Sequence, residues 1–289
     1  MQIKKFKYPV EQSEPPLSPR ETLPTMYDLP SENPEEPGLP DEFHYRQPPL
    51  LSLTFSPPNY PPEEVFSAGD MNLYYDVRHH FWYKRPDWFA VVGISKLYEN
   101  QDLRLSYVMW QEMVRPMVVV ELLSPGTEKE DLGTTVRLSS EPPTKWEVYE
   151  QILGVPYYIV FDRYTDDLKA FVLNAGSYQE LQLTEPKIWM PQLELGLGLW
   201  WGDYEGITRH WLRWYDAQGN WILTPREREI ITQEQLQAEK QRAEAEKQRA
   251  EAEKQRAETE KQRAEAERAR SKRLEELLRA QGIDPDSIS

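Results

Sequence analysis

The chain has 289 residues, no cysteine and a formal net charge of −15, from 49 acidic and 34 basic side chains. The missing cysteines exclude disulfides, thiolate metal sites and cysteine nucleophiles. The acidic balance argues against a general nucleic-acid binder, so any such contact must use a local patch, a bound cation or a partner. Apolar runs fall short of the roughly 20 residues that span a bilayer, and "MQIKKFKYPVEQSEPP" lacks the apolar segment of a secretory signal, so we expect a soluble, cytoplasmic protein.

Proline dominates the start of the chain. Fifteen of the 25 prolines lie within the first 62 residues, as in "EQSEPPLSPRETLP" and "SENPEEPGLP". Proline removes backbone donors and interrupts helices and central strands. We therefore predict a largely extended arm over residues 1–49, followed by a strand-like piece, "LLSLTF", over residues 50–55.

Residues 50–225 have the texture of an α/β domain. Short runs of β-branched and aromatic residues between turn residues predict strands, among them "NLYYDVRH", "DWFAVVGIS", "MVVVELLS", "YYIVFD" and "KAFVLN". In "PPTKWEVYEQILGVP" the apolar residues instead recur at helical spacing, and Thr144 with Glu147 predicts a capping box. Strand, helix and strand in this order predict a βαβ-like unit in a mixed sheet with flanking helices. The turn "DAQGN", between Trp214 and Trp221, predicts a surface hairpin that extends the domain.

We predict that residues 226–289 form one long, charged helix. "AEKQRAE" recurs with a period of seven from Ala238 to Glu265. Its alanines alternate at spacings of 2 and 5, whereas a coiled-coil seam needs spacings of 3 and 4. Opposite charges at i,i+3 and i,i+4 each contribute roughly 0.2–0.5 kcal/mol. We favour a solvated single helix, with a weak alanine coiled coil as the alternative.

The stretch "RPMVVVELLSP" places a carboxylate where a buried strand should end. Three valines predict a strand inside a sheet, and Glu121 follows them directly. A buried, unpaired carboxylate costs several kcal/mol, so it needs a partner, a proton or a metal. Asp87, in "RPDWFAVVGIS", precedes another apolar strand, and the two carboxylates can meet at one edge of the sheet. Such oxygens suit Mg²⁺, and Lys145 on the following helix could hold water or stabilise developing charge.

Each of these residues also has an ordinary structural interpretation. Asp87 follows a proline, where turn residues are common. Glu121 could be a salt-bridged or solvent-facing strand end, and Lys145 a solvated helix residue. From spacing alone, these alternatives stay open.

Several segments together resemble a known family. They are "PDWFAVV", "VVVELLSPGT", Asp131, "KWEVYEQILGVPYYIVFD" and the closing "AQGIDPD". In this order they resemble the Uma-two family of putative restriction endonucleases, which is abundant in cyanobacteria and belongs to the PD-(D/E)xK nuclease superfamily. The resemblance covers about residues 50–202 and the end of the terminal helix. It implies a restriction-endonuclease-like α/β core and phosphodiester hydrolysis dependent on Mg²⁺ or Mn²⁺.

The resemblance also implies metal ligands. Asp87 matches the first acid of the superfamily and Glu121 matches the second. In this nuclease class the main-chain carbonyl after the second acid tends to face the metal, which here is that of Leu122. The implied metal ligands are therefore Asp87, Glu121 and Leu122.

The lysine of the superfamily pattern is displaced. It normally lies two residues after the second acid, where this chain has Leu123. In this family the usual substitute is a helical lysine four residues before a tyrosine, which matches Lys145 and Tyr149. The stretch from Asp131 to Lys145 is longer than the family pattern, so Lys129 stays a second candidate.

We therefore predict a Mg²⁺-dependent DNA endonuclease with Asp87, Glu121 and Lys145 as catalytic residues. Phosphate contacts would fall to local basic residues such as Lys84, Arg85 and Arg104. The alternatives are an inactive nuclease fold that acts as an interaction scaffold with a helical tether, and a DNA-binding protein that never cleaves. We expect a homodimer, through the core or the C-terminal helix, because cutting both strands usually takes two active sites.

Overall fold

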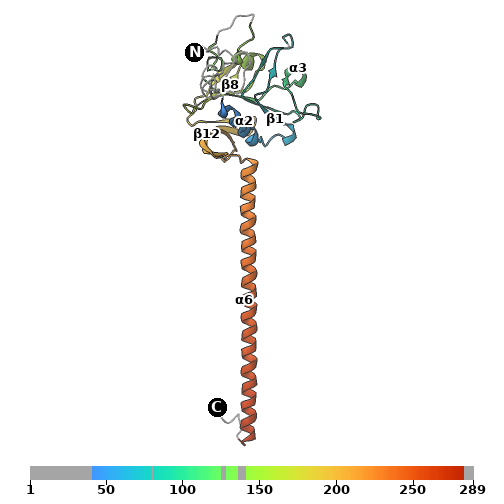
Figure 1. Ribbon diagram of the computed structural model, residues 1–289, viewed down its shortest axis with the longest axis vertical. Coiled ribbons are helices and arrows are strands. Elements are labelled where there is room, and N and C mark those ends of the chain that lie inside the picture. Colours follow the sequence, from blue (N-terminus) through green and yellow to red (C-terminus); the bar gives the residue numbers. More distant parts are fainter. Residues whose placement is uncertain (1–40, 80, 125–127, 136–140, 283–289) are drawn as a thin grey trace, which may run out of the picture. The chain divides into compact units, whose positions relative to one another are not determined.

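The computed structural model describes residues 41–79, 81–124, 128–135 and 141–282. The chain forms two compact units, which divide between Thr224 and Pro225 (Figure 1). Residues 1–40 of the predicted arm lie outside the described residues. Within the described part, no helix is both long and apolar enough to cross a membrane.

A six-stranded mixed sheet lies at the centre of the first unit, in the order β1-β4-β6-β7-β8-β9. Its strands are β1 (Val65–Gly69), β4 (Trp88–Val92), β6 (Val118–Leu122), β7 (Tyr157–Asp162), β8 (Asp167–Asn174) and β9 (Ser177–Glu180). β6 and β7 are parallel, and the other neighbours are antiparallel. Between these parallel strands the chain forms α5 (Lys145–Glu147) and the π-helical turn η2 (Val148–Ile152). The predicted α/β class and its βαβ-like unit are confirmed.

Smaller elements surround this sheet. A second sheet contains β10 (Lys187–Met190), β11 (Leu195–Tyr204) and β12 (Ile207–Tyr215). A third contains β3 (Tyr83–Lys84), β2 (Leu73–Tyr74) and β5 (Tyr107–Val108). The short helices are η1 (Pro62–Glu64), α3 (Met109–Glu112) and α4 (Glu128–Asp131).

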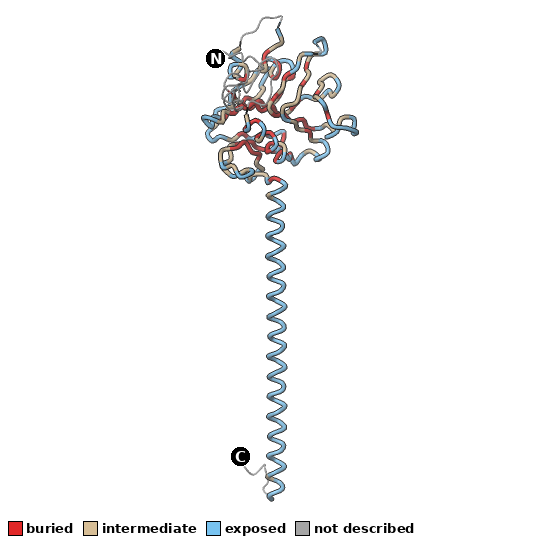
Figure 2. Tube along the Cα trace, in the orientation of Figure 1, coloured by how far each residue is buried: buried red, intermediate tan, exposed pale blue. Residues whose placement is uncertain are grey.

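Strand alternation divides the buried side chains between two cores. Figure 2 shows that much of the chain in this unit is buried. Val118 and Val120 of β6 belong to the first core, which includes residues of helix α2 (Glu42–Thr54) and of the second sheet. Val119 belongs to the other core, with Tyr149 of η2. Because successive side chains of a strand point to opposite faces, Glu121 faces the same side as Val119 and meets Tyr149.

The N-terminal part of the domain differs from the prediction. Residues 42–49 were expected to be extended and residues 50–55 to form a strand, and both predictions are wrong. These residues instead form helix α2 (Glu42–Thr54), with Asp41 as its N-cap. The side-chain oxygen of Asp41 accepts hydrogen bonds from the first-turn N–H groups of Phe43 and His44, at 2.8 and 3.2 Å.

Tertiary contacts explain why α2 forms despite Pro48 and Pro49 in its interior. Those prolines each remove a backbone donor, which disfavours a helix in isolation. The helix nevertheless buries Leu50 completely, and the side chain of Gln47 bonds both the N–H and the carbonyl of Leu212 in β12, each at 2.8 Å. Burial and long-range hydrogen bonds therefore outweigh local propensity here.

Replacing Phe43 with alanine is expected to destabilise the domain by about 3–5 kcal/mol. The ring is 3 % exposed and stacks on Trp211 at a centroid distance of 5.5 Å. Urea denaturation of the variant measures the decrease in the free energy of unfolding. Tyr45→Ala on the same helix is the control, because Tyr45 is 64 % exposed and should change stability by no more than about 0.5 kcal/mol. Equal stability of both variants would contradict the placement of α2 in the core.

The predicted hairpin around "DAQGN" forms, but it is not a surface ribbon throughout. Ile222 N–H donates to the Trp214 carbonyl at 2.9 Å, and Tyr215 bridges to Trp221. Trp214 is fully buried and contacts the rings of Phe55 and Trp88. The prediction of a surface position is therefore wrong for Trp214, because its indole ring is needed to fill the first core.

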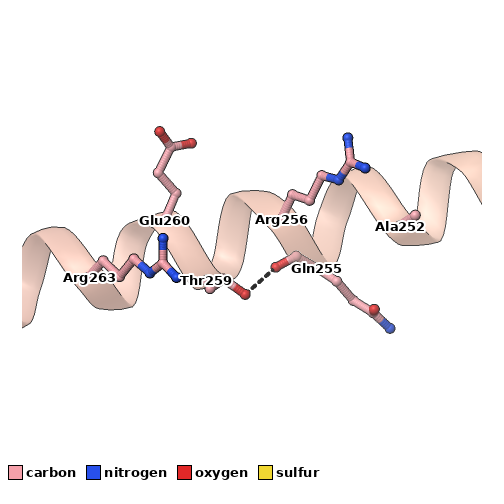
Figure 3. A pocket seen from close by; sticks show the side chains of 6 residues that line it. All are labelled: Ala252, Gln255, Arg256, Thr259, Glu260 and Arg263. Atoms are coloured by element: carbon pink, nitrogen blue, oxygen red, sulfur yellow. Dashed lines mark hydrogen bonds between the residues drawn. The ribbon is translucent and has the colours of Figure 1, made fainter.

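The second unit contains the helix α6 (Pro225–Ala280), and none of its described residues is buried. This confirms the predicted helix, while its self-association stays a prediction. Figure 3 shows a groove on one face of α6, where Thr259 donates to the main-chain carbonyl of Gln255 at 2.8 Å. The groove is lined by Ala252, Gln255, Arg256, Thr259, Glu260 and Arg263. Because one helix supplies all of this lining, it encloses no site.

Candidate active site

Asp87 directly precedes β4, and Glu121 lies in β6. The antiparallel register pairs Trp88 with Val120, and if it is continued by one position, Asp87 would lie opposite Glu121. Directly opposite residues project from the same face with Cβ atoms about 4.5–5.5 Å apart. The Oδ2 atom of Asp87 also accepts a hydrogen bond from the N–H of Leu122 at 2.6 Å. The sheet thus brings together two carboxylates that are remote in sequence.

Glu121 is completely buried, and two side chains engage its carboxylate. Lys145 Nζ lies 2.9 Å from Oε2, and the Tyr149 hydroxyl donates to Oε1 at 2.9 Å. The predicted capping box of Thr144 and Glu147 is present and begins this helix at Lys145. Since residues four apart share a helix face, the capping box determines where both Lys145 and Tyr149 point.

Asp131 is a third carboxylate of this cluster, and we did not predict it as a site residue. It is 1 % exposed, and its Oδ1 lies 2.8 Å from Lys145 Nζ. Among the described residues its Oδ2 has no hydrogen-bond partner. The available signal was its place in the family resemblance, but the charged run "EKED" around it is typical of a solvated surface.

The three carboxylates of the cluster stabilise a positive charge on Lys145. Burial raises the pKa of Glu121 well above its ordinary value, and Asp131 and Asp87 raise it further, against the opposing effect of Lys145. Burial raises the pKa of Asp87 as well. Burial alone would lower the pKa of Lys145, but Glu121, Asp131 and Asp87 together hold that pKa well above its ordinary value. The ammonium therefore stays charged and is shared by an excess of carboxylates.

A comparison with models of protein families shows the family to which the chain belongs. The model of Uma2, described as "Putative restriction endonuclease", matches residues 19–208, which is more than half of the chain. The chain belongs to the Uma2 family.

Other comparisons add little to this Uma2 assignment. The chain is similar to a solved structure from Anabaena variabilis, titled as a putative nuclease belonging to DUF820, with 12 % identity and a TM-score of 0.35. That match covers 54 % of this chain and 76 % of the other. A search of curated proteins found no match. With its mixed sheet and βαβ-like unit, the Uma2 domain has a restriction-endonuclease-like fold.

Of the two candidate lysines, Lys145 is the one beside Glu121. Lys129 lies in α4 and is exposed. Its main-chain carbonyl accepts a hydrogen bond from Thr134 N–H at 2.9 Å, and no ion pair of its side chain is found among the described residues. In this Uma2 protein the lysine on the later helix, Lys145, is therefore the candidate that lies beside Glu121.

The basic residues expected to contact phosphate are engaged elsewhere. Their ion pairs are Lys84–Glu130 at 3.0 Å, Arg85–Asp70 at 2.7 Å and Arg104–Glu112 at 2.7 Å. Lys84 and Arg104 are also buried. Their charges are balanced within the domain, which weakens the expectation that they contact phosphate.

The oxygen atoms of Asp87, Glu121 and the neighbouring main chain are of the type that a hard cation binds. Two carboxylates and the carbonyl of Leu122 supply oxygen ligands, the type that Mg²⁺ and Mn²⁺ take. Buried Asp131 has an Oδ2 without a hydrogen-bond partner among the described residues, although Lys145 pairs with its Oδ1. Within the described residues, however, no three histidine, cysteine or acidic side chains are gathered as a metal site. A cation here would rely on two carboxylates, the main-chain oxygen and water.

Proposed function

We propose that this Uma2 protein is a Mg²⁺-dependent DNA endonuclease that hydrolyses phosphodiester bonds. The observation that carries the proposal is the cluster of Asp87, Glu121 and Asp131 around one charged lysine at the end of β6. Ionisable side chains whose pKa is strongly shifted by both burial and a specific charge partner mark candidate functional sites. Family membership favours a nuclease over other activities that such a cluster could support.

In this proposal Asp87, Glu121 and the Leu122 carbonyl would hold the cation. When bound, Mg²⁺ or Mn²⁺ supplies a Lewis acid that polarises the phosphate and lowers the pKa of bound water. The protein would prepare the ligands beforehand. Tyr149 fixes the rotamer of Glu121 through Oε1, and the Leu122 N–H fixes the rotamer of Asp87 through Oδ2.

Lys145 would act through its positive charge and not as a general base. Three carboxylates raise its pKa, so it keeps its proton at neutral pH. An ammonium held 2.8 Å from Asp131 and 2.9 Å from Glu121 can orient a water or stabilise negative charge on a phosphate. Asp131 would thus be the residue that positions Lys145.

An interaction scaffold is the second candidate function. Both oxygens of Glu121 already have partners, and the predicted phosphate contacts are ion-paired. These observations favour a nuclease fold kept for stability, with α6 as a tether. A DNA-binding protein that does not cleave is the third alternative.

Incubation of the purified protein with supercoiled plasmid separates these functions. We expect nicked or linear plasmid with Mg²⁺, and intact plasmid when a chelator is added or when Glu121→Gln replaces the wild type. Retention of DNA without cleavage would instead support the non-cleaving binder. If the protein neither retains nor cuts DNA with Mg²⁺ or Mn²⁺ present, the interaction scaffold would be the remaining candidate function.

A further inference from the structure

His44 of helix α2 contacts the main chain of Leu122, the residue whose N–H Asp87 holds. Its Nε2 lies 2.8 Å from the carbonyl oxygen of Leu122, 78 residues away in sequence. Its Nδ1 lies 3.0 Å from Oδ1 of Asp41, whose Oδ2 lies 2.6 Å from Arg163. The imidazole is only 1 % exposed. A buried side chain from the N-terminal helix therefore contacts the carbonyl that the proposed cation would share.

Both ring nitrogens of His44 face atoms that can only accept hydrogen bonds. A carboxylate oxygen and a main-chain carbonyl have no hydrogen to donate, so each contact requires an N–H on the ring. Such a ring is the imidazolium form. The geometry thus gives the Leu122 carbonyl a donor from helix α2, with Asp41 accepting from the other ring nitrogen.

The main chain explains why the Leu122 carbonyl needs this partner. If the register of β4 and β6 is continued by two positions past Trp88 and Val120, Pro86 would lie opposite Leu122. Proline has no N–H to offer the ladder. The Leu122 carbonyl therefore has no ladder donor at this position and is bonded by His44. The N–H of Leu122 donates to the Asp87 side chain.

We infer that His44 is a positioning residue of the proposed cation site, where it holds the Leu122 carbonyl in place while Asp41 orients its ring. The inference rests on the proposed function, because it assigns the Leu122 carbonyl to that site. A carbonyl oxygen has two lone pairs, so the hydrogen bond from His44 leaves one for a cation. His44 acts on the cation through Leu122 and does not replace a ligand.

Two substitutions of His44 test this role by Mn²⁺ binding, measured by isothermal titration calorimetry on the full chain. The amide nitrogen of His44→Gln extends about as far as Nε2 and can donate to Leu122, whereas that of His44→Asn reaches only as far as Nδ1. Loss of a partner that orients a ligand typically weakens metal binding about 10–100-fold. We therefore expect this loss in His44→Asn and an affinity close to that of the wild type in His44→Gln.

Thr54→Val is the matched control, because Thr54 is a buried residue of the same helix whose hydroxyl, among the described residues, bonds the Leu50 carbonyl and not Leu122. It should bind Mn²⁺ as the wild type does. Equal affinity of His44→Asn and wild type would overturn the role of His44. Failure of the wild type to bind Mn²⁺ would overturn it together with the cation site. Mn²⁺ binding that weakens in His44→Asn, by a protein that cuts no DNA, would reject only the endonuclease.

Discussion

Replacing Lys145 with methionine is expected to lower the free energy of unfolding by about 3–5 kcal/mol, as for other buried ion pairs that lose one partner. Methionine keeps much of the side-chain length but removes the charge. Glu121 and Asp131 are 0 % and 1 % exposed, and both lose their ammonium partner at 2.9 and 2.8 Å. Two buried carboxylates would then have to stay charged without a counterion or take up protons.

Denaturation in urea at several pH values measures this effect. Protonation of Glu121 removes an unpaired charge, so the deficit of Lys145→Met should shrink as the pH falls from neutral, because the pKa of folded Glu121 lies well above its ordinary value. The control is Lys129→Met, an exposed lysine whose loss should change stability by no more than about 0.5 kcal/mol. A deficit of that small size in Lys145→Met, at neutral pH, would mean that the ammonium does not hold the carboxylates in solution.

Replacing Glu121 with glutamine is expected to reduce Mg²⁺-dependent cleavage by about 100-fold or more. A bound cation contributes several kcal/mol of transition-state stabilisation, and each 1.36 kcal/mol corresponds to about tenfold in rate. The variant removes one of the two carboxylates that we propose as ligands, while the Tyr149 hydroxyl can still donate to the amide oxygen. Cleavage rates at saturating DNA, measured across a Mg²⁺ titration, give the comparison. Wild-type rates in the variant would remove Glu121 from the catalytic residues.

The same variant should be at least as stable as the wild type in a chelator at neutral pH. The pKa of Glu121 in the folded protein lies well above its ordinary value of 4.5. A group with a raised pKa contributes its full stability below the ordinary value and loses it as the pH rises through the folded value. Glutamine does not titrate, so the advantage of Glu121→Gln should grow from pH 4 to pH 8. Chemical denaturation would contradict this if the variant became relatively less stable over that range.

Local patterns in the sequence predicted much of the domain and part of its site. The valine run of β6 and the aromatic run of β7 identified buried strands, because alternation and β propensity act over a few residues. The capping box of Thr144 and Glu147 predicted where the helix begins, and the family resemblance, not this local pattern, pointed to Lys145 with Tyr149. The catalytic roles of Asp87, Glu121 and Lys145 remain predictions.

What the sequence by itself determined are features that depend on near neighbours: the strands, the capped helix and the charged C-terminal helix. Only the tertiary structure decided that Asp131 joins Lys145, and that residues 42–54 form a helix whose His44 bonds the Leu122 carbonyl. The physical reason is that burial and long-range hydrogen bonds depend on what the folded chain brings together. They override the local preferences of proline and of charged runs, and those preferences are all that a short stretch of sequence expresses.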